Sequence, residues 1–217
     1  MISRPIKEKD FNLILKLDKK VYPTDSPVKQ ETIKKWYSNN PEFALIYEEN
    51  KKITGLCIAI PMKADAWNKF IKGKIIESEL NEKTIFRNSE NQGLGIHIYH
   101  IEKLNKTIEK FYEKCFKDLA EIVRKMKKEN KKLELTGISA LCTTEKGINL
   151  FSKLNFKEKN FFCKEYVIKE KGKKKVINAK TMEKLKKTSK NLKQTIRCKM
   201  LVLTPEQKSI LWDYFRE

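Results

Sequence analysis

The chain has 217 residues, of which 48 are Lys or Arg and 28 are Asp or Glu, so its formal net charge is +20. Apolar residues make up 40%, with 11 Phe, 7 Tyr and 3 Trp, which is enough for a hydrophobic core and excludes wholesale disorder. No apolar run approaches the roughly 18 residues of a membrane span, and the first residues lack the apolar stretch of a signal peptide. Five scattered cysteines form no C-x-x-C pair, so we expect neither a disulfide framework nor a metal site, and a cytoplasmic location.

The basic excess has two interpretations. Only five of the 48 basic residues are Arg, and the abundance of Lys, Asn and Ile is what an A+T-rich coding sequence produces without selection for binding. The distribution favours a role in binding, because residues 169–217 hold 15 basic and five acidic side chains, a net charge of +10. Both interpretations stay open at this point.

The first half of the chain predicts alternating strands and helices. Residues 2–5 form a short strand, and apolar side chains at three- and four-residue spacing predict helices over residues 11–21 and 28–39. The apolar runs 43–47 and 53–60, separated by a polar turn, predict a hairpin. In the following insert, 61–94, the aromatic and apolar positions from 67 to 75 indicate a helix and residues 92–95 a turn.

The second half continues the pattern. We expect strands over 95–101, 133–141 and 161–168, a long helix from about 106 to 130, and a short helix over 144–154. This order indicates an α/β fold over residues 1–168. Residues 169–217 form a Lys-rich C-terminal extension in this interpretation. It has a basic helical stretch at 181–195, and a capping box at 204–207 opens a terminal amphipathic helix.

Several of these segments resemble the GNAT superfamily of acyl-CoA-dependent N-acyltransferases. Residues 2–23 look like the first strand and helix of that family, and the sequence ITGL at 53–56 resembles its third strand. The sequence LFSKLNF at 150–156 matches the closing box LYxxxGF, with Phe151 in place of Tyr and Asn155 in place of Gly. The resemblance covers residues 1–168 and implies a mixed central sheet flanked by helices.

The resemblance also implies acetyl-CoA as the acyl donor. In the family, the pyrophosphate lies on N–H groups at the start of the long helix after the fourth strand. The family signature there is [Q/R]-x-x-G-x-[G/A], and its equivalent is residues 110–115. Lys110 can replace the basic residue and Cys115 is small, but Glu113 stands where Gly is usual.

Two explanations of that departure stay open. Either the helix begins earlier, near residues 105–107, so that Asn105 caps it and Lys103 and Lys106 face the phosphates, or the chain has lost cofactor binding; we favour the first. The residues we expect to contact acetyl-CoA are Ile101, Lys103, Lys106, Lys110, Phe111, Cys115, Thr144 and Phe151.

Direct attack of an amine on a thioester needs a base and is helped by an acid. The family acid corresponds to Phe151, which has no proton to donate, so Tyr112, Tyr99 and Cys142 are considered as substitutes. The two histidines, His97 and His100, lie on the predicted fourth strand. His100 and Glu102 are two residues apart and therefore share a strand face.

The catalytic candidates are thus His100, Glu102 and Tyr112. Alternatively, His97 and Tyr99 pack in the core and His100 only ends the strand. In the insert, Glu77 and Glu79 either line a groove for a cationic substrate or form a solvated face, and Trp67 and Phe70 form either core or a lid over the acceptor.

Three functions follow. The first is an acetyl-CoA-dependent N-acetyltransferase with an unidentified amine acceptor, and the second is a non-catalytic or weakly catalytic protein that binds nucleic acid or another polyanion through residues 169–199. The third is a regulatory or homodimerising role for residues 201–215, whose apolar face can cover the chain's own domain or a partner.

Overall fold

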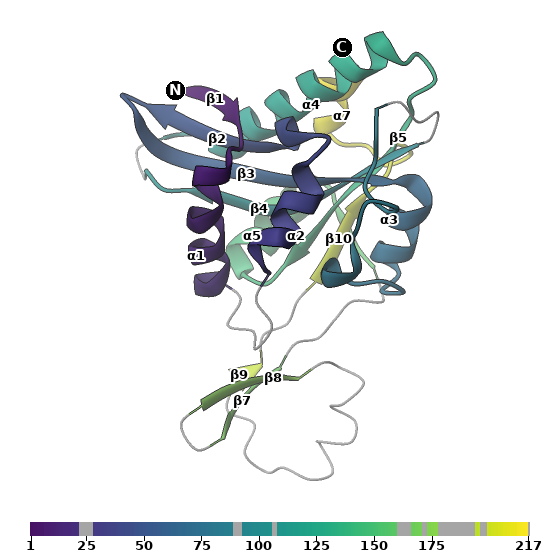
Figure 1. Ribbon diagram of the computed structural model, residues 1–217. Helices are drawn as coiled ribbons and strands as arrows, with labels where there is room; N and C mark the ends of the chain where they lie inside the picture. Colours follow the sequence, from purple (N-terminus) through teal and green to yellow (C-terminus); the bar gives the residue numbers. More distant parts are fainter. Residues whose placement is uncertain are drawn as a thin grey trace.

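The computed structural model describes residues 1–21, 28–88, 93–105, 108–159, 166–170, 173–177, 194–195 and 199–216. Its main element is a seven-stranded sheet in the order β1-β2-β3-β4-β5-β10-β6, and a second sheet has the order β8-β7-β9. Figure 1 shows helices α1 and α2 in front of the main sheet.

The strands of the main sheet are β1 (Ile2–Pro5), β2 (Ala44–Glu49), β3 (Lys52–Lys63), β4 (Leu94–Lys103), β5 (Leu135–Cys142), β6 (Lys157–Glu158) and β10 (Lys199–Leu203). The α-helices are α1 (Phe11–Val21), α2 (Gln30–Tyr37), α3 (Ala64–Ile71), α4 (Phe111–Glu129), α5 (Glu145–Lys153) and α7 (Leu211–Arg216). The described residues also form the short 3-10 helices η1 (Glu8–Asp10), η2 (Pro41–Phe43) and η3 (Glu77–Glu79). The small sheet consists of β7 (Tyr166–Glu170), β8 (Lys173–Ile177) and β9 (Gln194–Thr195).

The main sheet is mixed, as expected. Its neighbouring strands pair antiparallel except β4 and β5, which are parallel and are joined by the crossover helix α4. A parallel pair needs such a crossover, because the chain must return to the edge of the sheet from which it started.

The face covered by α4 and α5 is packed with apolar side chains. The aromatic ring of Phe111, at the start of α4, lies directly on Gly55 of β3, where a Cβ atom would be only 2.4 Å from its Cζ atom. Phe111 also makes an edge contact with Tyr47, and Phe116 of α4 does so with Phe151 of α5. The glycine in the ITGL sequence is therefore required by close approach of α4 to the sheet.

On the opposite face, α3 covers the beginning of β4. The indole of Trp67 lies on Gly95 and Gly137, which are register partners in β4 and β5, and the side chain is almost fully buried. The expectation of a turn at residues 92–95 is wrong for Leu94 and Gly95, which already belong to β4. Phe70 is also buried, so the core interpretation of these aromatic residues is confirmed.

Helix α5 ends as the closing box requires. Asn155, at the family's Gly position, has φ 66° and lies in the left-handed region, and the N–H of Phe156 donates to the carbonyl of Phe151. Asn is the non-glycine residue that tolerates this conformation best, so it can replace Gly at the C-terminal cap.

The last described segment completes the main sheet. Strand β10 pairs with both β5 and β6, and Leu201, Val202 and Leu203 are buried. Helix α7 packs on α4 and buries Leu211 and Trp212. The apolar face of residues 201–215 therefore covers the chain's own domain, and residues 199–216 are part of the sheet domain although the sequence places them in the extension.

The rest of the expected extension is described only in part. The predicted helical stretch 181–195 lies outside the described residues apart from Gln194–Thr195, which form β9. The predicted strand 161–168 overlaps β7, whose described partners are β8 and β9. A boundary at residue 168 stays a prediction.

Candidate active site

A bulge in β4 gathers polar side chains on one face of the sheet. Ile58 of β3 pairs with His100 and Ala59 pairs with Ile98, so Tyr99 is an extra residue. A bulge shifts the alternation of side chains by one position. His97 before it and His100 after it therefore point to the same face, the one covered by α1, α2 and α3.

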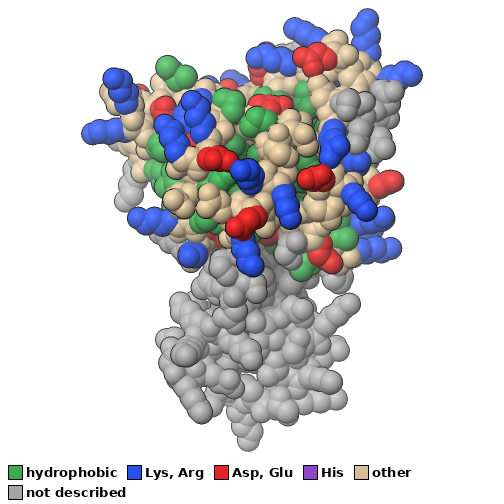
Figure 2. Space-filling view, viewed as in Figure 1, with side chains coloured by type: hydrophobic (Ala, Val, Ile, Leu, Met, Phe, Trp, Pro, Cys, Tyr) green, Lys and Arg blue, Asp and Glu red, His purple; other side chains and the backbone are tan. Residues whose placement is uncertain are grey.

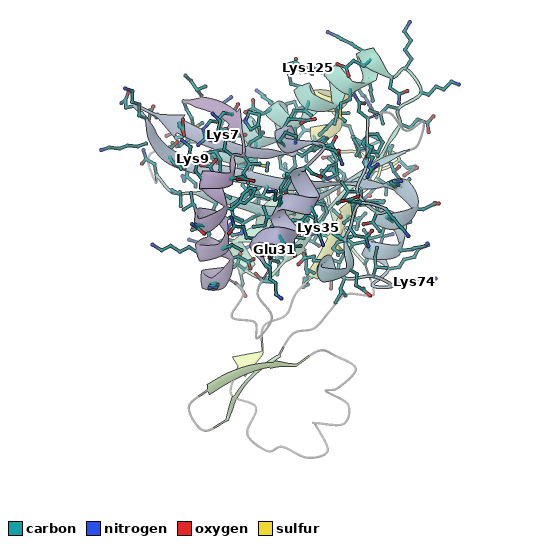
Figure 3. The ribbon with its side chains drawn as sticks, in the orientation of Figure 1. Lys7, Lys9, Glu31, Lys35, Lys74 and Lys125 are labelled. Atoms are coloured by element: carbon teal, nitrogen blue, oxygen red, sulfur yellow. The ribbon has the colours of Figure 1, made fainter. Side chains whose placement is uncertain are left out.

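Ring contacts confirm this orientation. The imidazole of His97 lies 4.6 Å from the ring of Phe70 in α3, and Tyr99 lies 5.2 Å from Trp36 in α2, both measured between ring centroids. Figure 3 labels Glu31 and Lys35 of α2, whose side chains are exposed, whereas Trp36 of the same helix is buried against the sheet.

Strands β4 and β5 separate at the same place. Their ladder ends at the pair Ile98 and Ala140, although β4 continues to Lys103 and β5 to Cys142. Within the described residues, the second half of β4 thus has no ladder partner on its β5 side.

His100 and Glu102 form a close pair beyond the bulge. The Nε2 atom of His100 is 2.9 Å from Oε2 of Glu102, the His100 side chain is 7% exposed, and the carboxylate is half-buried. The sequence argument that both side chains share a face is correct, and His100 does not end the strand.

Asp18 of α1 meets Tyr99 beneath this pair. The Tyr99 hydroxyl donates a hydrogen bond to Oδ1 of Asp18, whose carboxylate is buried. Burial raises the pKa of Asp18, and the negative charge of Glu77 raises it further, against the opposing effects of the Tyr99 hydroxyl and of His100.

His97 is fully buried and belongs to a polar chain within the core. Its Nδ1 atom is 3.0 Å from Oγ of Ser139, and the same oxygen accepts a 3.0 Å hydrogen bond from Nε1 of Trp67. Since the indole only donates, the hydroxyl proton of Ser139 can reach Nδ1. The other ring nitrogen, Nε2, lies 3.4 Å from Oε1 of Glu77.

The two glutamates of η3 behave differently. Glu77 is directed at His97, whereas the carboxylate of Glu79 accepts the N–H of Ile76 at the exposed start of η3. The cationic-groove interpretation therefore stays open for Glu77 alone.

The loop before α4 corrects one expectation. The helix begins at Phe111 and the described residues 108–110 are not helical, so the proposed earlier start near residue 105 is wrong. The N–H of Asn105 donates to the carbonyl of Thr54, which anchors the loop on β3, and Asn105 does not cap α4. Lys106 lies outside the described residues.

Residues 110–115 thus open the helix, where the family signature lies. Lys110 has φ 47°, a left-handed conformation, and its ammonium is 3.9 Å from the carboxylate of Glu113. Lys103 donates to the carbonyl of Ile108 within the same loop. The charge of Glu113 is consequently offset in part by Lys110.

Most of the other residues expected to contact the cofactor are packed in the hydrophobic core. Cys115, Phe111 and Phe151 are buried between α4, α5 and the sheet, while Ile101 is half-buried and pairs with Cys57. The thiol of Cys115 and burial both raise the pKa of Cys57.

Three further candidates lie at the ends of elements: Thr144 before α5, Tyr112 in the first turn of α4, and Cys142 at the end of β5. Thr144 caps α5 by accepting the N–H of Gly147 at 3.1 Å. Tyr112 belongs to α4, on the sheet face opposite His100, and its hydroxyl donates to Glu113 at 3.4 Å. Burial raises the pKa of Cys142 to about 12. The roles of all these residues stay predictions.

Among the described residues, no group of three or more His, Cys, Asp or Glu side chains is arranged to hold a metal ion. In the same part of the chain, no helix combines the length and apolar character needed to cross a bilayer.

The fold of the chain was compared with known proteins, and it matches solved structures of N-acetyltransferases at low sequence identity. The chain matches Arabidopsis thaliana Naa50 in complex with the bisubstrate analogue CoA-Ac-MVNAL at 9% identity, covering 94% of this chain and 97% of the other, with a TM-score of 0.50. It matches Arabidopsis thaliana NAA60 in complex with a bisubstrate analogue at 12% identity, with the same coverage and TM-score. The fold is that of the GNAT N-acetyltransferases. No family model and no curated relative matches the sequence.

Nothing in the sequence indicated two residues that contact the polar side chains of β4, Asp18 and Ser139. Asp18 is one acidic residue among the charged positions of α1, and only the tertiary contact with Tyr99 distinguishes it. The link between His97 and Ser139 joins residues 42 positions apart and leaves no local pattern. Glu77, in contrast, was identified from the sequence as one of the two glutamates of the insert that could line a groove for a cationic substrate.

Proposed function

We propose that the protein transfers an acetyl group from acetyl-CoA to a primary amine. The observation that carries this proposal is the His100–Glu102 pair at the bulge of β4, at the point where β4 separates from β5, in a sheet with the GNAT fold.

The residues around α4 fit a CoA diphosphate. The first turn of α4 presents backbone N–H groups, whose partial positive charge favours an anion, and Lys110 is 75% exposed at its start. Lys103 and Lys110 would hold the phosphates, and the pairing of Lys110 with Glu113 lowers the repulsion that a lone carboxylate would exert. The cofactor supplies the acetyl group as a thioester.

His100 is assigned the role of base. Glu102 accepts the Nε2 proton of the imidazole, which leaves the lone pair on Nδ1 available. The amine reaches the reaction as an ammonium ion, and Nδ1 takes its proton before the nitrogen attacks. Transfer then forms the C–N bond and breaks the C–S bond, the electron pair goes to sulfur, and the second amine proton completes the thiol through solvent or an acid.

Tyr112 is our candidate for that acid, since Phe151 has no acidic proton. Its hydroxyl is next to Glu113 at the start of α4. A Tyr112→Phe variant is expected to lower kcat/KM for acetyl transfer by about 100-fold while it retains acetyl-CoA binding. A variant with the kcat/KM of the wild type would exclude Tyr112 as the acid.

The proposed activity is tested by release of the CoA thiol in the presence of a panel of primary amines, with the acetylated product identified by mass. We expect thiol release that depends on both the amine and the protein. Thiol release at the same rate without amine, and no acetylated product with any amine in the panel, would contradict the proposal.

A second proposal concerns polyanions. Residues 199–217 contain three basic and three acidic side chains, so the net charge of +10 counted for residues 169–217 belongs entirely to residues 169–198. This segment lies between β6 and β10, which are neighbours in the sheet. We propose that it contacts nucleic acid, and we expect binding of a single-stranded RNA that weakens steeply between 50 and 200 mM salt. Binding unaffected by salt would contradict this.

A further inference from the structure

The bulge of β4 directs two consecutive side chains to the same face of the sheet. Tyr99 is the extra residue, and its ring lies 5.2 Å from that of Trp36 in α2. His100 follows on the same face, and its charge acts on the carboxylate of Asp18 in α1. In a regular strand, neighbouring side chains alternate between the two faces. The orientation of the His100 imidazole therefore depends on the bulge and on the contacts that hold Tyr99 in place.

Asp18 holds Tyr99 from outside the sheet. Its Oδ1 atom accepts the hydrogen bond of the Tyr99 hydroxyl, and its carboxylate also accepts the N–H of Val28, just before α2. Asp18 is 2% exposed and Tyr99 is 6% exposed, so water does not compete for this bond. One buried carboxylate thus joins α1, the segment that leads into α2, and the bulge of β4.

This polar pair is not what packing alone would select. Burial disfavours the charged form of a carboxylate and raises the pKa of Asp18. Two apolar side chains of similar size would fill the space without that cost. Figure 2, viewed from the side of α1 and α2, shows Lys, Asp and Glu side chains at the surface, whereas Asp18 is buried. A buried polar pair beside a candidate base is a local cost that a functional role explains.

We propose that Asp18 is a positioning residue, which acts through the Tyr99 hydroxyl and holds the bulge of β4 so that the His100 imidazole faces the reacting amine. In the proposed mechanism His100 takes the proton of the amine, and Asp18 touches neither substrate nor cofactor. This inference rests on the proposed acetyltransferase function, because it assigns a further residue to the same reaction.

The first test is Tyr99→Phe, which removes the hydroxyl and keeps the ring that packs on Trp36. We expect kcat for acetyl transfer to fall about tenfold and KM for acetyl-CoA to stay within about twofold, because a slightly displaced base loses its alignment with the amine but not its cofactor. An unchanged kcat would overturn the inference.

Tyr37→Phe is the matched control. Tyr37 of α2 is also buried, and its hydroxyl donates to the carbonyl of Ala59 at 2.9 Å, so this variant loses one buried hydrogen bond of the same kind, made to β3 instead of to α1. We expect Tyr37→Phe to keep the wild-type kcat. Equal losses of kcat in the two variants would show a general loosening of the core and would overturn the assignment to Tyr99 and Asp18.

Two substitutions of Asp18 separate its hydrogen bond from its charge. Asp18→Asn keeps an oxygen that can accept the Tyr99 proton, whereas Asp18→Ala keeps none. We expect kcat to be clearly higher in Asp18→Asn than in Asp18→Ala. Equal losses would show that the charge matters and the hydrogen bond does not, and would overturn the route through Tyr99.

Failure of the inference is distinguishable from failure of the proposed function, because the surroundings of His100 can be measured without activity. The chain has two histidines, so the imidazole signals in an NMR spectrum of the full-length protein can be assigned with His100→Gln. At fixed pH, we expect Tyr99→Phe to shift the His100 signal and Tyr37→Phe to leave it unchanged. An unmoved His100 signal in Tyr99→Phe would reject the inference whatever the activity. A shifted signal in a protein that acetylates no amine would retain the hydrogen-bonded bulge and reject the acetyltransferase.

Discussion

The two faces of the main sheet at β3 and β4 are built from different chemistry. The face toward α4 is apolar, with Phe111 on Gly55 and Cys115 beside Cys57. The opposite face carries two histidines whose partners are carboxylates. Apolar burial stabilises the fold, whereas a buried polar group costs stability unless it is paired. Both faces are packed, since Trp67 and Phe70 are buried on the side of the histidines, but only that side carries the polar pairs on which the proposed function depends.

The largest effect is expected on the apolar face. Phe111→Ala removes a buried ring that contacts Gly55 and Tyr47, and should lower the free energy of unfolding by about 4 kcal/mol. Urea denaturation followed by circular dichroism measures this. Lys128→Ala, at an exposed position of the same helix, is the control and should change stability by less than about 0.5 kcal/mol. A loss below about 1 kcal/mol for Phe111→Ala would contradict the packing described.

The next effect falls on the polar face and concerns the rate. His100→Gln should lower kcat/KM for acetyl transfer at least about 100-fold, because a general base contributes 10²–10⁴, while acetyl-CoA affinity stays within about threefold. The readout is CoA thiol release with parallel calorimetric titration. If the His100→Gln enzyme kept its activity, another group would have to take the proton. The polar face of the sheet would then no longer be the source of the catalytic base.

A smaller effect tests the close approach of α4. Gly55→Ala places a Cβ atom 2.4 Å from the Phe111 ring and should cost about 2 kcal/mol. In the Phe111→Leu background the same substitution should cost clearly less, because the shorter side chain leaves space. Additive costs in a double-mutant cycle would indicate that the glycine is needed for another reason.

The smallest effect is a pH dependence from Asp18. Burial raises its pKa in the folded state, so the folded protein holds this proton at pH values where the unfolded chain has lost it. The contribution of Asp18 to stability therefore decreases as pH rises from about 4 through the raised pKa, by at most about 1.4 kcal/mol per pH unit. Asp18→Asn should remove this slope, so its stability relative to the wild type should improve with rising pH. Parallel curves for the two proteins would contradict the raised pKa.

Much of the fold was predictable because its signals are local. The amphipathic pattern of α4 and the apolar runs of β3 and β4 can be seen in short windows of sequence. Asn155 and Gly55 could be recognised from the closing box and the third-strand pattern, and the structure gives their physical reasons, a left-handed backbone and a ring that occupies the Cβ position.

The remainder depends on pairing between distant residues. The register of β10 places Val202 opposite Ser139 and was not foreseeable from a run of four apolar residues, 200–203. The start of α4 was predicted too early, since Asn105 is bound to Thr54 of β3 and not to the helix. In the site, the His100–Glu102 pair followed from a spacing of two, whereas the contact of Asp18 with Tyr99 spans 81 positions.

The central claim is that residues 110–115 and the separated strands β4 and β5 receive acetyl-CoA despite Glu113. Isothermal titration of acetyl-CoA into the protein at moderate salt tests it most directly, with CoA and ATP as controls because any polyanion can bind a chain of charge +20. We predict one site, micromolar affinity, and binding clearly tighter than that of ATP. Acetyl-CoA binding no tighter than ATP binding would contradict the account and would leave polyanion contact through residues 169–198 as the function to test.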